Sequence, residues 1–350
     1  MIFYTSIDRK DYSRKQTIKK MTESSNLKGF EKLFPDTIIN AIESLDYIPD
    51  KRILLLNSFE NRVYRIGIES KSPIIAKFYR ENRWANETIQ EEHQFTLELK
   101  DSGIPVIAPL VINNNTLFEF ENYRFSIYPC FGGYAPELDN SEHLMQLGLI
   151  LAQLHNIGDM NAFEKRQKLT IQTYAKEPAE YLLENNFIPT DLEDAYSTLI
   201  NDIIKRITNS FEKAGDFKTL RIHGDCHNGN MLTRDEKFFF LDFDDACSGP
   251  AIQDIWMFLS GDRDYMSARL NDFMDGYMKF RKFDACELHL IEALRTMRII
   301  HYAGWLAQRW DDPAFPIAFP FFNTQQYWQD QILSLREQAA LMDEPPLILK

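Results

Sequence analysis

Eight residues just past the middle of the chain, 223–230, have the sequence HGDCHNGN and carry several side chains that could take part in chemistry. Asp225 and Asn230 lie on this segment, and Asp242 follows at the end of the apolar run FFFLD. If the strands on either side of the segment form a hairpin, Asn230 and Asp242 can reach one metal ion. Their oxygens suit Mg²⁺, which also takes phosphate and water as ligands. Asp225 would then be free to accept a proton from a hydroxyl group.

Such motifs are usually structural when they occur alone, because Asp and Asn favour turns. Here they occur together and in order, and this combination favours a site. A base, a carboxamide and a metal-binding aspartate are the parts that the larger lobe of a kinase brings to phosphoryl transfer. We therefore predict that Asp225 and Asp242 are catalytic, and that Asn230 and Asp242 bind the metal.

A further candidate is Lys77, which stands in the strand-like segment IIAKFYR with apolar residues on both sides. A buried ammonium group is costly unless a carboxylate pairs with it. The amphipathic segment that follows offers Glu91 and Glu92 as partners. Phe95 and Leu99 come three and seven residues after Glu92, which places Glu92 on the core-facing side of a helix. We therefore favour Glu92 as the partner and expect Glu91 to be solvated.

The elements that would position these residues change character along the chain. Short segments rich in β-branched and aromatic residues predict strands, with one amphipathic helix among them. These strands are expected at 52–58, 62–68, 73–80, 106–112, 116–122 and 123–130, and the helix at 88–103. The first third of the chain is therefore predicted to be α+β, with antiparallel hairpins.

The rest of the chain is predicted to be mainly helical. A helix begins at 141 with Ser141 as its N-cap. Further helices are expected near 174–186, 191–213, 252–260, 265–281, 285–310 and 324–341, with irregular packing at 311–322. The only strands expected here flank the loop that carries Asp225. We predict a flexible extension at 1–34, a small β-rich lobe at 35–128 and a larger helical lobe at 129–350.

Composition excludes several classes of protein. The formal net charge of −13 argues against a nucleic-acid partner, which normally needs a basic face. No apolar run approaches the length of a membrane span, and the N-terminus lacks a signal-peptide apolar region. We therefore expect a cytoplasmic protein without a membrane partner, and a monomer. The four cysteines are scattered without a C-x-x-C pair, so we expect reduced thiols.

Several motifs in order resemble one known family. NSFENRVYRI, KFYRENRW, EEHQF, HGDCHNGN, LDFDDACSGPAIQDIWM and RWDDPAFP closely resemble the bacterial stress response kinase A family. These are cytoplasmic serine/threonine protein kinases linked to envelope and oxidative stress, within the aminoglycoside phosphotransferase and choline kinase-like branch of the protein-kinase-like fold. The resemblance covers about residues 35–330. It implies a two-lobed α+β fold, ATP as co-substrate, Mg²⁺, and a protein acceptor with serine or threonine, including the enzyme itself.

The resemblance also implies a role for each candidate residue. Asp225 would be the catalytic base, and Asn230 and Asp242 would hold Mg²⁺. Lys77 would hold the phosphates of ATP, and Glu92 would hold Lys77.

Further site residues are implied by the resemblance alone. Ser58, on the first turn between strands, would lie over the phosphates. Tyr128, Pro129 and Cys130 would form the hinge beside adenine. Asp254 would brace the catalytic loop by accepting backbone N–H bonds, and we expect the two histidines of HGDCHNGN to orient that loop.

The chain departs from ordinary protein kinases in two places. The turn that would cover the phosphates, NSFENRVYRIG, contains only Gly67 where a glycine-rich loop is usual. Only twelve positions separate Asp242 from Asp254, which is too few for a long activation loop. We therefore expect no switching by phosphorylation of such a loop.

The acceptor is the least determined part of the prediction. The segment 295–310 could line an acceptor cleft with aromatic and cationic side chains, or could simply be a core helix with a basic edge; these side chains are Arg295, Arg298, His301, Tyr302, Trp305, Arg309 and Trp310. The resemblance favours a protein acceptor. The alternatives are a small-molecule kinase acting on an amino alcohol or a sugar hydroxyl, and a nucleotide-binding scaffold without catalysis.

Overall fold

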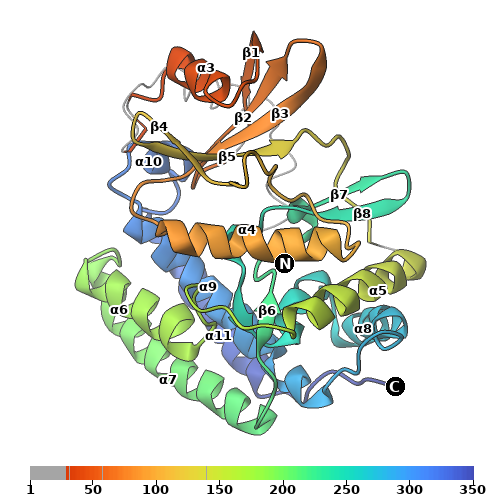
Figure 1. Ribbon diagram of the computed structural model, residues 1–350. Helices are drawn as coiled ribbons and strands as arrows, with labels where there is room; N and C mark the ends of the chain where they lie inside the picture. The colour runs from red at the N-terminus through yellow and green to blue at the C-terminus, as the bar shows by residue number, and fades with distance from the viewer. Residues whose placement is uncertain (1–28, 31, 57, 139) are drawn as a thin grey trace.

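The computed structural model describes residues 29–30, 32–56, 58–138 and 140–350, and Figure 1 shows a twisted sheet above a larger helical part. The sheet contains β1 (Pro49–Leu55), β2 (Arg62–Ile68), β3 (Lys71–Phe78), β4 (Phe118–Phe120) and β5 (Tyr123–Pro129). All neighbouring strands are antiparallel, in the order β1-β2-β3-β5-β4. We call this part, with the helices α3 (Pro35–Glu43) and α4 (Asn86–Asp101), the N-lobe, and the part after β5 the C-lobe. The predicted two-lobed α+β fold is confirmed.

The strand β3 lies in the middle of the sheet and carries Lys77. Lys77 is paired with Val63 of β2 on one side and Ser126 of β5 on the other. Successive side chains of a strand point to opposite faces. Ile74, Ala76 and Phe78 belong to the core of the N-lobe, while Ile75 and Lys77 line a cavity on the other face. Alternation along one strand thus delivers Lys77 to the site.

The helix α4 (Asn86–Asp101) runs between the sheet and the C-lobe (Figure 1). Its inward face buries Glu92, Phe95 and Leu99, as the spacing of apolar residues predicted. Gly103, at φ +81°, ends the helix, and the N–H of Ile104 bonds the carbonyl of Leu99 at 2.9 Å. Glycine suits this left-handed position because it has no Cβ.

The helix α3 (Pro35–Glu43) was not anticipated from the sequence. It buries Ile38, Ala41 and Ile42 against the sheet. Phe30 and Leu33 join the same core, so the end of the predicted flexible extension packs onto the N-lobe. The remainder of that extension, 1–28, lies outside the described residues.

The C-lobe is built mainly from helices, with short strands around the catalytic loop. Its helices are α5 (Ser141–Gly158), α6 (Glu177–Glu184), α7 (Thr190–Ala214), α8 (Arg263–Tyr277), α9 (Ile291–Gln308), α10 (Ala314–Ala318) and α11 (Gln325–Met342), and its strands are β6 (Leu220–Ile222), β7 (Met231–Arg234), β8 (Lys237–Phe240) and β9 (Cys247–Gly249). A π-helical turn, Gln172–Lys176, precedes α6. Within the described residues, no helix has both the length and the apolar composition needed to cross a bilayer.

The predicted hairpin exists, but other strands form it. We expected the strand before the catalytic loop to pair with the strand after it. Instead β6 pairs with β9, and the hairpin is β7 with β8. Asp235 and Glu236, both with positive φ, form its two-residue turn, which matches the twist of a hairpin. The N–H of Leu241 bonds the carbonyl of Asn230 at 3.1 Å, so the hairpin still brings the flanks of Asn230 and Asp242 together.

Smaller differences concern the ends and regularity of elements. The N-cap of α5 is Asn140 rather than Ser141, because the Asn140 side chain accepts the N–H of Glu142 at 2.6 Å. The segment 106–112 forms only isolated bridges instead of a strand. The segment 252–260 forms 3₁₀ turns instead of a helix, and α10 lies in a stretch expected to be irregular.

The close contact of α5 and α8 gives a test of the C-lobe core. A Cβ atom on Gly276 would collide with the main-chain oxygen of Met145. Because a backbone cannot move aside cheaply, we expect Gly276→Ala to lower the free energy of unfolding by about 1–3 kcal/mol or more. Urea unfolding measures this. Gly132→Ala is the control, because a Cβ there meets nothing within 4 Å. Equal stability of the two variants would contradict the close packing.

Candidate active site

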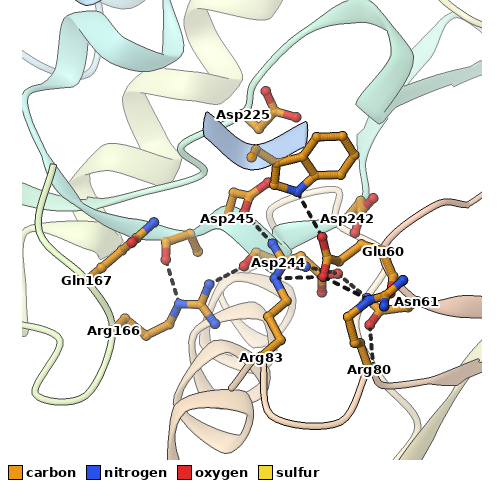
Figure 2. A network of polar contacts seen from close by, with 12 residues as sticks. Glu60, Asn61, Arg80, Arg83, Arg166, Gln167, Asp225, Asp242, Asp244 and Asp245 are labelled. Atoms are coloured by element: carbon orange, nitrogen blue, oxygen red, sulfur yellow. Dashed lines mark hydrogen bonds and ion pairs between the residues drawn. The ribbon is translucent and has the colours of Figure 1, made fainter. Parts of the chain in front are cut away.

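A cavity of about 1170 Å³ lies between the lobes and is lined by most of the predicted site residues, although Asn230 and Cys130 are not part of its lining. The N-lobe contributes Ser58, Lys77 and Glu92 to its lining, and the C-lobe contributes Asp225 and Asp242. Figure 2 shows the polar contacts in this region, with Asp225 at the top of the view, Asp242 at the right and Asp244 in the middle of the network. The fold thus brings together residues that are up to 184 positions apart in the sequence, from Ser58 to Asp242.

The catalytic loop is fixed at its start by Asp254. The N–H groups of His223 and Gly224 each donate to the Asp254 carboxylate at 2.8 Å. His155 contacts the same carboxylate at 3.2 Å, and Asp254 is fully buried. Gly224 has φ +84° and packs directly on the main-chain oxygen of Asp245, so no other residue fits there. The bracing role expected for Asp254 agrees with these bonds.

Asp225 is held by donors from three directions. Arg298 of α9 forms an ion pair with one carboxylate oxygen, and the other lies 3.3 Å from His227 Nε2 and 3.2 Å from Asn230 Nδ2. Burial by itself would raise the pKa of Asp225, but the Arg298 guanidinium and then His227 outweigh it and hold the pKa below its usual range. Asp225 is therefore a carboxylate at neutral pH and can accept a hydrogen bond from a hydroxyl group.

The oxygens of Asn230 and Asp242 fit the ligands that Mg²⁺ takes beside phosphate and water. The Asn230 amide nitrogen is used for bonds to the main-chain and side-chain oxygens of Asp225, so its oxygen is the atom that can face a metal. The Asp242 side chain is 48% exposed and lines the cavity. In the described part of the chain no group of three or more His, Cys, Asp or Glu residues could hold a metal. Two protein oxygens suit a Mg²⁺ ion whose remaining ligands are phosphate and water.

Lys77 has partners other than the one expected. Its Nζ lies 3.0 Å from Asp242 and also pairs with Asp244. Among the described residues there is no Lys77–Glu92 ion pair within 4.0 Å, so the predicted pairing is wrong. Burial would lower the pKa of Lys77, but Asp242 and Asp244 outweigh it and raise the pKa well above its ordinary value. The ammonium group is therefore always charged.

Glu92 is nevertheless buried close to this cluster. Burial raises the pKa of Glu92 to about 7, Asp244 adds to the effect, and Lys77 opposes it. The neighbouring Glu91 is not simply solvated, as we had expected. Its carboxylate accepts the backbone N–H groups of the loop 164–166, at 2.5 to 2.9 Å. Glu91 thus fastens α4 to the C-lobe, whereas Glu92 is buried among the charges of the site.

Asp244 is a site residue that the sequence reasoning missed. Besides Lys77, it receives Asn61 Nδ2 at 2.6 Å and lies 3.5 Å from Arg83. Its main-chain oxygen accepts from Arg166, as Figure 2 shows. The run LDFDDA contained the signal, because it places three acidic residues after one strand. Only the tertiary structure tells which of them faces Lys77.

Of the three residues predicted to form the hinge, two line the cavity. Tyr128 and Pro129 line the cavity together with Phe131, and Cys130, the predicted hinge residue between them, is half-buried but does not belong to the lining. Tyr128 is positioned by a 3.2 Å bond to the Tyr79 hydroxyl.

The helix α9 and its C-cap residue Arg309 contribute five of the seven side chains suggested for an acceptor cleft. These are Arg298, His301, Tyr302, Trp305 and Arg309. Arg295 instead stacks on Trp256, and Trp310 packs against Phe322. Burial lowers the pKa of His301 to about 4, helped by Arg298, so this imidazole is neutral. The helix therefore presents a face of arginine and aromatic groups to the cavity.

Comparison with known proteins identifies the family to which this chain belongs. The sequence model of the "Phosphotransferase enzyme family" matches residues 52–289. Serine/threonine protein kinase RdoA of Salmonella typhimurium is 39% identical over 326 residues, covering 93% of this chain and 98% of that protein. Stress response kinase A of Escherichia coli K12 is 39% identical over 320 residues, covering 91% and 97%. The chain belongs to the phosphotransferase enzyme family and, within it, to the stress response kinase A family.

Solved structures agree on the fold. An amicoumacin kinase in complex with AMP-PNP, Ca²⁺ and Ami has a TM-score of 0.66 at 19% identity, covering 86% of this chain and 91% of its own. A microcompartment-associated aminopropanol kinase has a TM-score of 0.66 at 15% identity, covering 87% and 96%. The resemblance inferred from the motifs, and the kinase-like fold that it implied, are confirmed.

The raised pKa of Glu92 predicts a specific pH dependence of stability. Glu92 binds its proton more tightly in the folded state, so the free energy of unfolding should fall as pH rises from 4.5 to about 7. The shift is worth at most about 3 kcal/mol. We expect Glu92→Gln to gain up to this amount relative to wild type between pH 5 and pH 8 in urea unfolding. The same pH dependence in both proteins would contradict the assignment.

Proposed function

We propose that this chain is an ATP- and Mg²⁺-dependent protein kinase that phosphorylates serine or threonine. The observation that carries the proposal is the convergence of Asp225, Lys77 and Asp242 on one cavity between the lobes. Phosphoryl transfer needs little covalent help from the protein, only positioning and compensation of charge. The relatives named serine/threonine protein kinase and stress response kinase A support the protein acceptor and a role in a stress response.

Each residue has one task in this proposal. Asp225 orients the acceptor hydroxyl and takes its proton late, because a carboxylate with a low pKa is a weak base until the phosphoryl group has largely transferred. Lys77 stabilises the negative charge of the nucleotide phosphates. Asn230 and Asp242 hold Mg²⁺, which neutralises phosphate charge when bound. Ser58 covers the phosphates from above, and the hinge at Tyr128 and its neighbours receives the adenine.

The remaining features of the proposal follow from composition and family. The protein acts in the cytoplasm as a monomer, without a nucleic-acid or membrane partner. The enzyme itself is one acceptor, and the physiological substrate is another protein. The cavity can receive an acceptor on the α9 side, because Tyr302, 41% exposed, lines it together with Asp225.

The role of Asp225 predicts a separation of binding from catalysis. With γ-labelled ATP, Mg²⁺ and casein, wild type should transfer label to serine or threonine. Asp225→Asn should lower the rate by about 10²–10⁴-fold while ATP affinity, measured by calorimetry, stays within a few-fold. Asp242→Asn should instead remove the Mg²⁺-dependent part of ATP binding. Near-normal turnover of Asp225→Asn would exclude it as the base.

The acceptor class is decided by the same assay. Transfer to casein or to the enzyme itself supports a protein kinase. ATP consumption only with an amino alcohol or a sugar would assign a small-molecule kinase. ATP binding without any turnover would leave a scaffold.

The short connection after Asp242 predicts that the kinase is not switched there. Between 243 and 253 the only hydroxyl side chain is Ser248, which lies in β9 and is 9% exposed. Because it is paired with Arg221 of β6, a kinase cannot reach it without unfolding the strand. We expect phosphosite mapping by mass spectrometry to find no modification in this segment. Stoichiometric phosphorylation of Ser248 that changes activity would contradict the prediction.

A further inference from the structure

The turn between β1 and β2, which would cover the phosphates, is fastened to the acceptor-side helix through Glu60. The Glu60 carboxylate accepts from Trp305 Nε1 of α9 at 2.8 Å and from Nε of Arg309, the C-cap residue of α9, at 2.6 Å. Arg80 and Arg83, from the segment after β3, lie 3.4 and 3.7 Å from the same carboxylate. Only 11% of the Glu60 side chain is exposed. One buried carboxylate therefore joins the turn to two other parts of the molecule.

The charge of Glu60 is stable in this setting. Burial would raise its pKa, but Arg83, Arg309 and Arg80 outweigh burial and lower it. A buried carboxylate that stays ionised needs these partners, and they need it. The contact is therefore maintained across the neutral pH range.

The same turn is held at its neighbouring residues as well. Arg80 donates to the main-chain oxygens of Phe59 and Glu60, at 3.2 and 3.0 Å, and pairs with Asp312 at 2.8 Å. The next residue, Asn61, bonds Asp244 at 2.6 Å. Figure 2 shows Glu60, Asn61 and Arg80 gathered at this point. The turn is thus attached to the C-lobe over consecutive residues, two positions after Ser58, which lines the cavity.

This attachment explains how a turn without glycines can serve a phosphate site. A glycine-rich loop moves its backbone close to the phosphates because it is flexible. Here the backbone is held in place by side-chain bonds to the C-lobe. The turn is then already ordered in the folded protein, so nucleotide binding loses no further conformational entropy in ordering it.

We propose that Glu60 is a positioning residue that couples the phosphate-covering turn to α9, so that α9 sets the affinity for nucleotide phosphates. This inference rests on the proposed function in taking the cavity as the ATP site. Because coupling between two ligands is reciprocal, an acceptor that presses on α9 beside Trp305 changes ATP affinity, and ATP changes acceptor affinity equally.

The test distinguishes binding of the ATP phosphates from binding of the adenosine part of the nucleotide. Glu60→Gln keeps the size of the side chain and removes its charge, and Trp305→Phe keeps an aromatic ring and removes the N–H donor. We expect Glu60→Gln to weaken Mg²⁺-ATP binding by about tenfold or more, and Trp305→Phe by several-fold, in calorimetric titrations. Adenosine, which does not reach the turn, should bind each variant as it binds wild type. Glu69→Gln, on the exposed β2–β3 turn, is the matched control and should change neither.

Each outcome decides the inference. Equal weakening of ATP and adenosine would show a general structural role and overturn the coupling, as would unchanged ATP affinity in both variants. If Glu60→Gln does not fold, as thermal unfolding would show, Trp305→Phe alone decides. Wild type that binds neither ligand would refute the proposed function itself. Wild type that transfers phosphate while both variants keep its ATP affinity would refute only the coupling.

Discussion

The rest of the site depends on the mutual compensation of buried charge between the lobes. Removing an ion from water costs several kcal/mol unless partners replace the water. Neither lobe has a complete set of partners. Lys77 of the sheet has its carboxylates, Asp242 and Asp244, in the C-lobe, and Glu60 has its closest donors on α9 and at the C-cap of that helix. The two lobes must therefore meet in one arrangement for these charges to be satisfied, and this arrangement forms the cavity.

The degree of burial also distinguishes the residues proposed to take part in chemistry from the residues that hold them in position. Asp242 is exposed to the cavity, whereas Asp244 is buried and takes bonds from Asn61 and Lys77. Lys77 thus keeps one fixed partner even if Asp242 turns toward a metal ion. Asp254, fully buried behind the loop, holds backbone N–H groups instead of a cation. The buried carboxylates thus fix Lys77 and the start of the loop that carries Asp225, while Asp242 stays exposed to the cavity.

The compensation of buried charge between the lobes also attaches the turn between β1 and β2, which we propose covers the phosphates. In a glycine-rich loop, flexibility lets the backbone approach the phosphates. In this protein the turn contains no glycine between 56 and 66, and side-chain bonds to α9 and Asp244 fix it from the C-lobe. If the cavity binds nucleotide and acceptor as proposed, the two sites share one structural element, and the geometry of one depends on the other.

The sequence by itself determined the two-lobed α+β fold, a strand that carries Lys77, a helix with Glu92 on its inward face and the order of the candidate motifs, because these follow from local periodicity and from residue types at fixed spacing. Only the tertiary structure decided which carboxylate pairs with Lys77, that β6 pairs with β9, and that Glu60 contacts α9. The strand β9 reads CSG and carries no local β signal, and Glu60 and Trp305 are 245 residues apart. Contacts of this kind are selected by burial and charge across the assembled core, where local pattern carries no information.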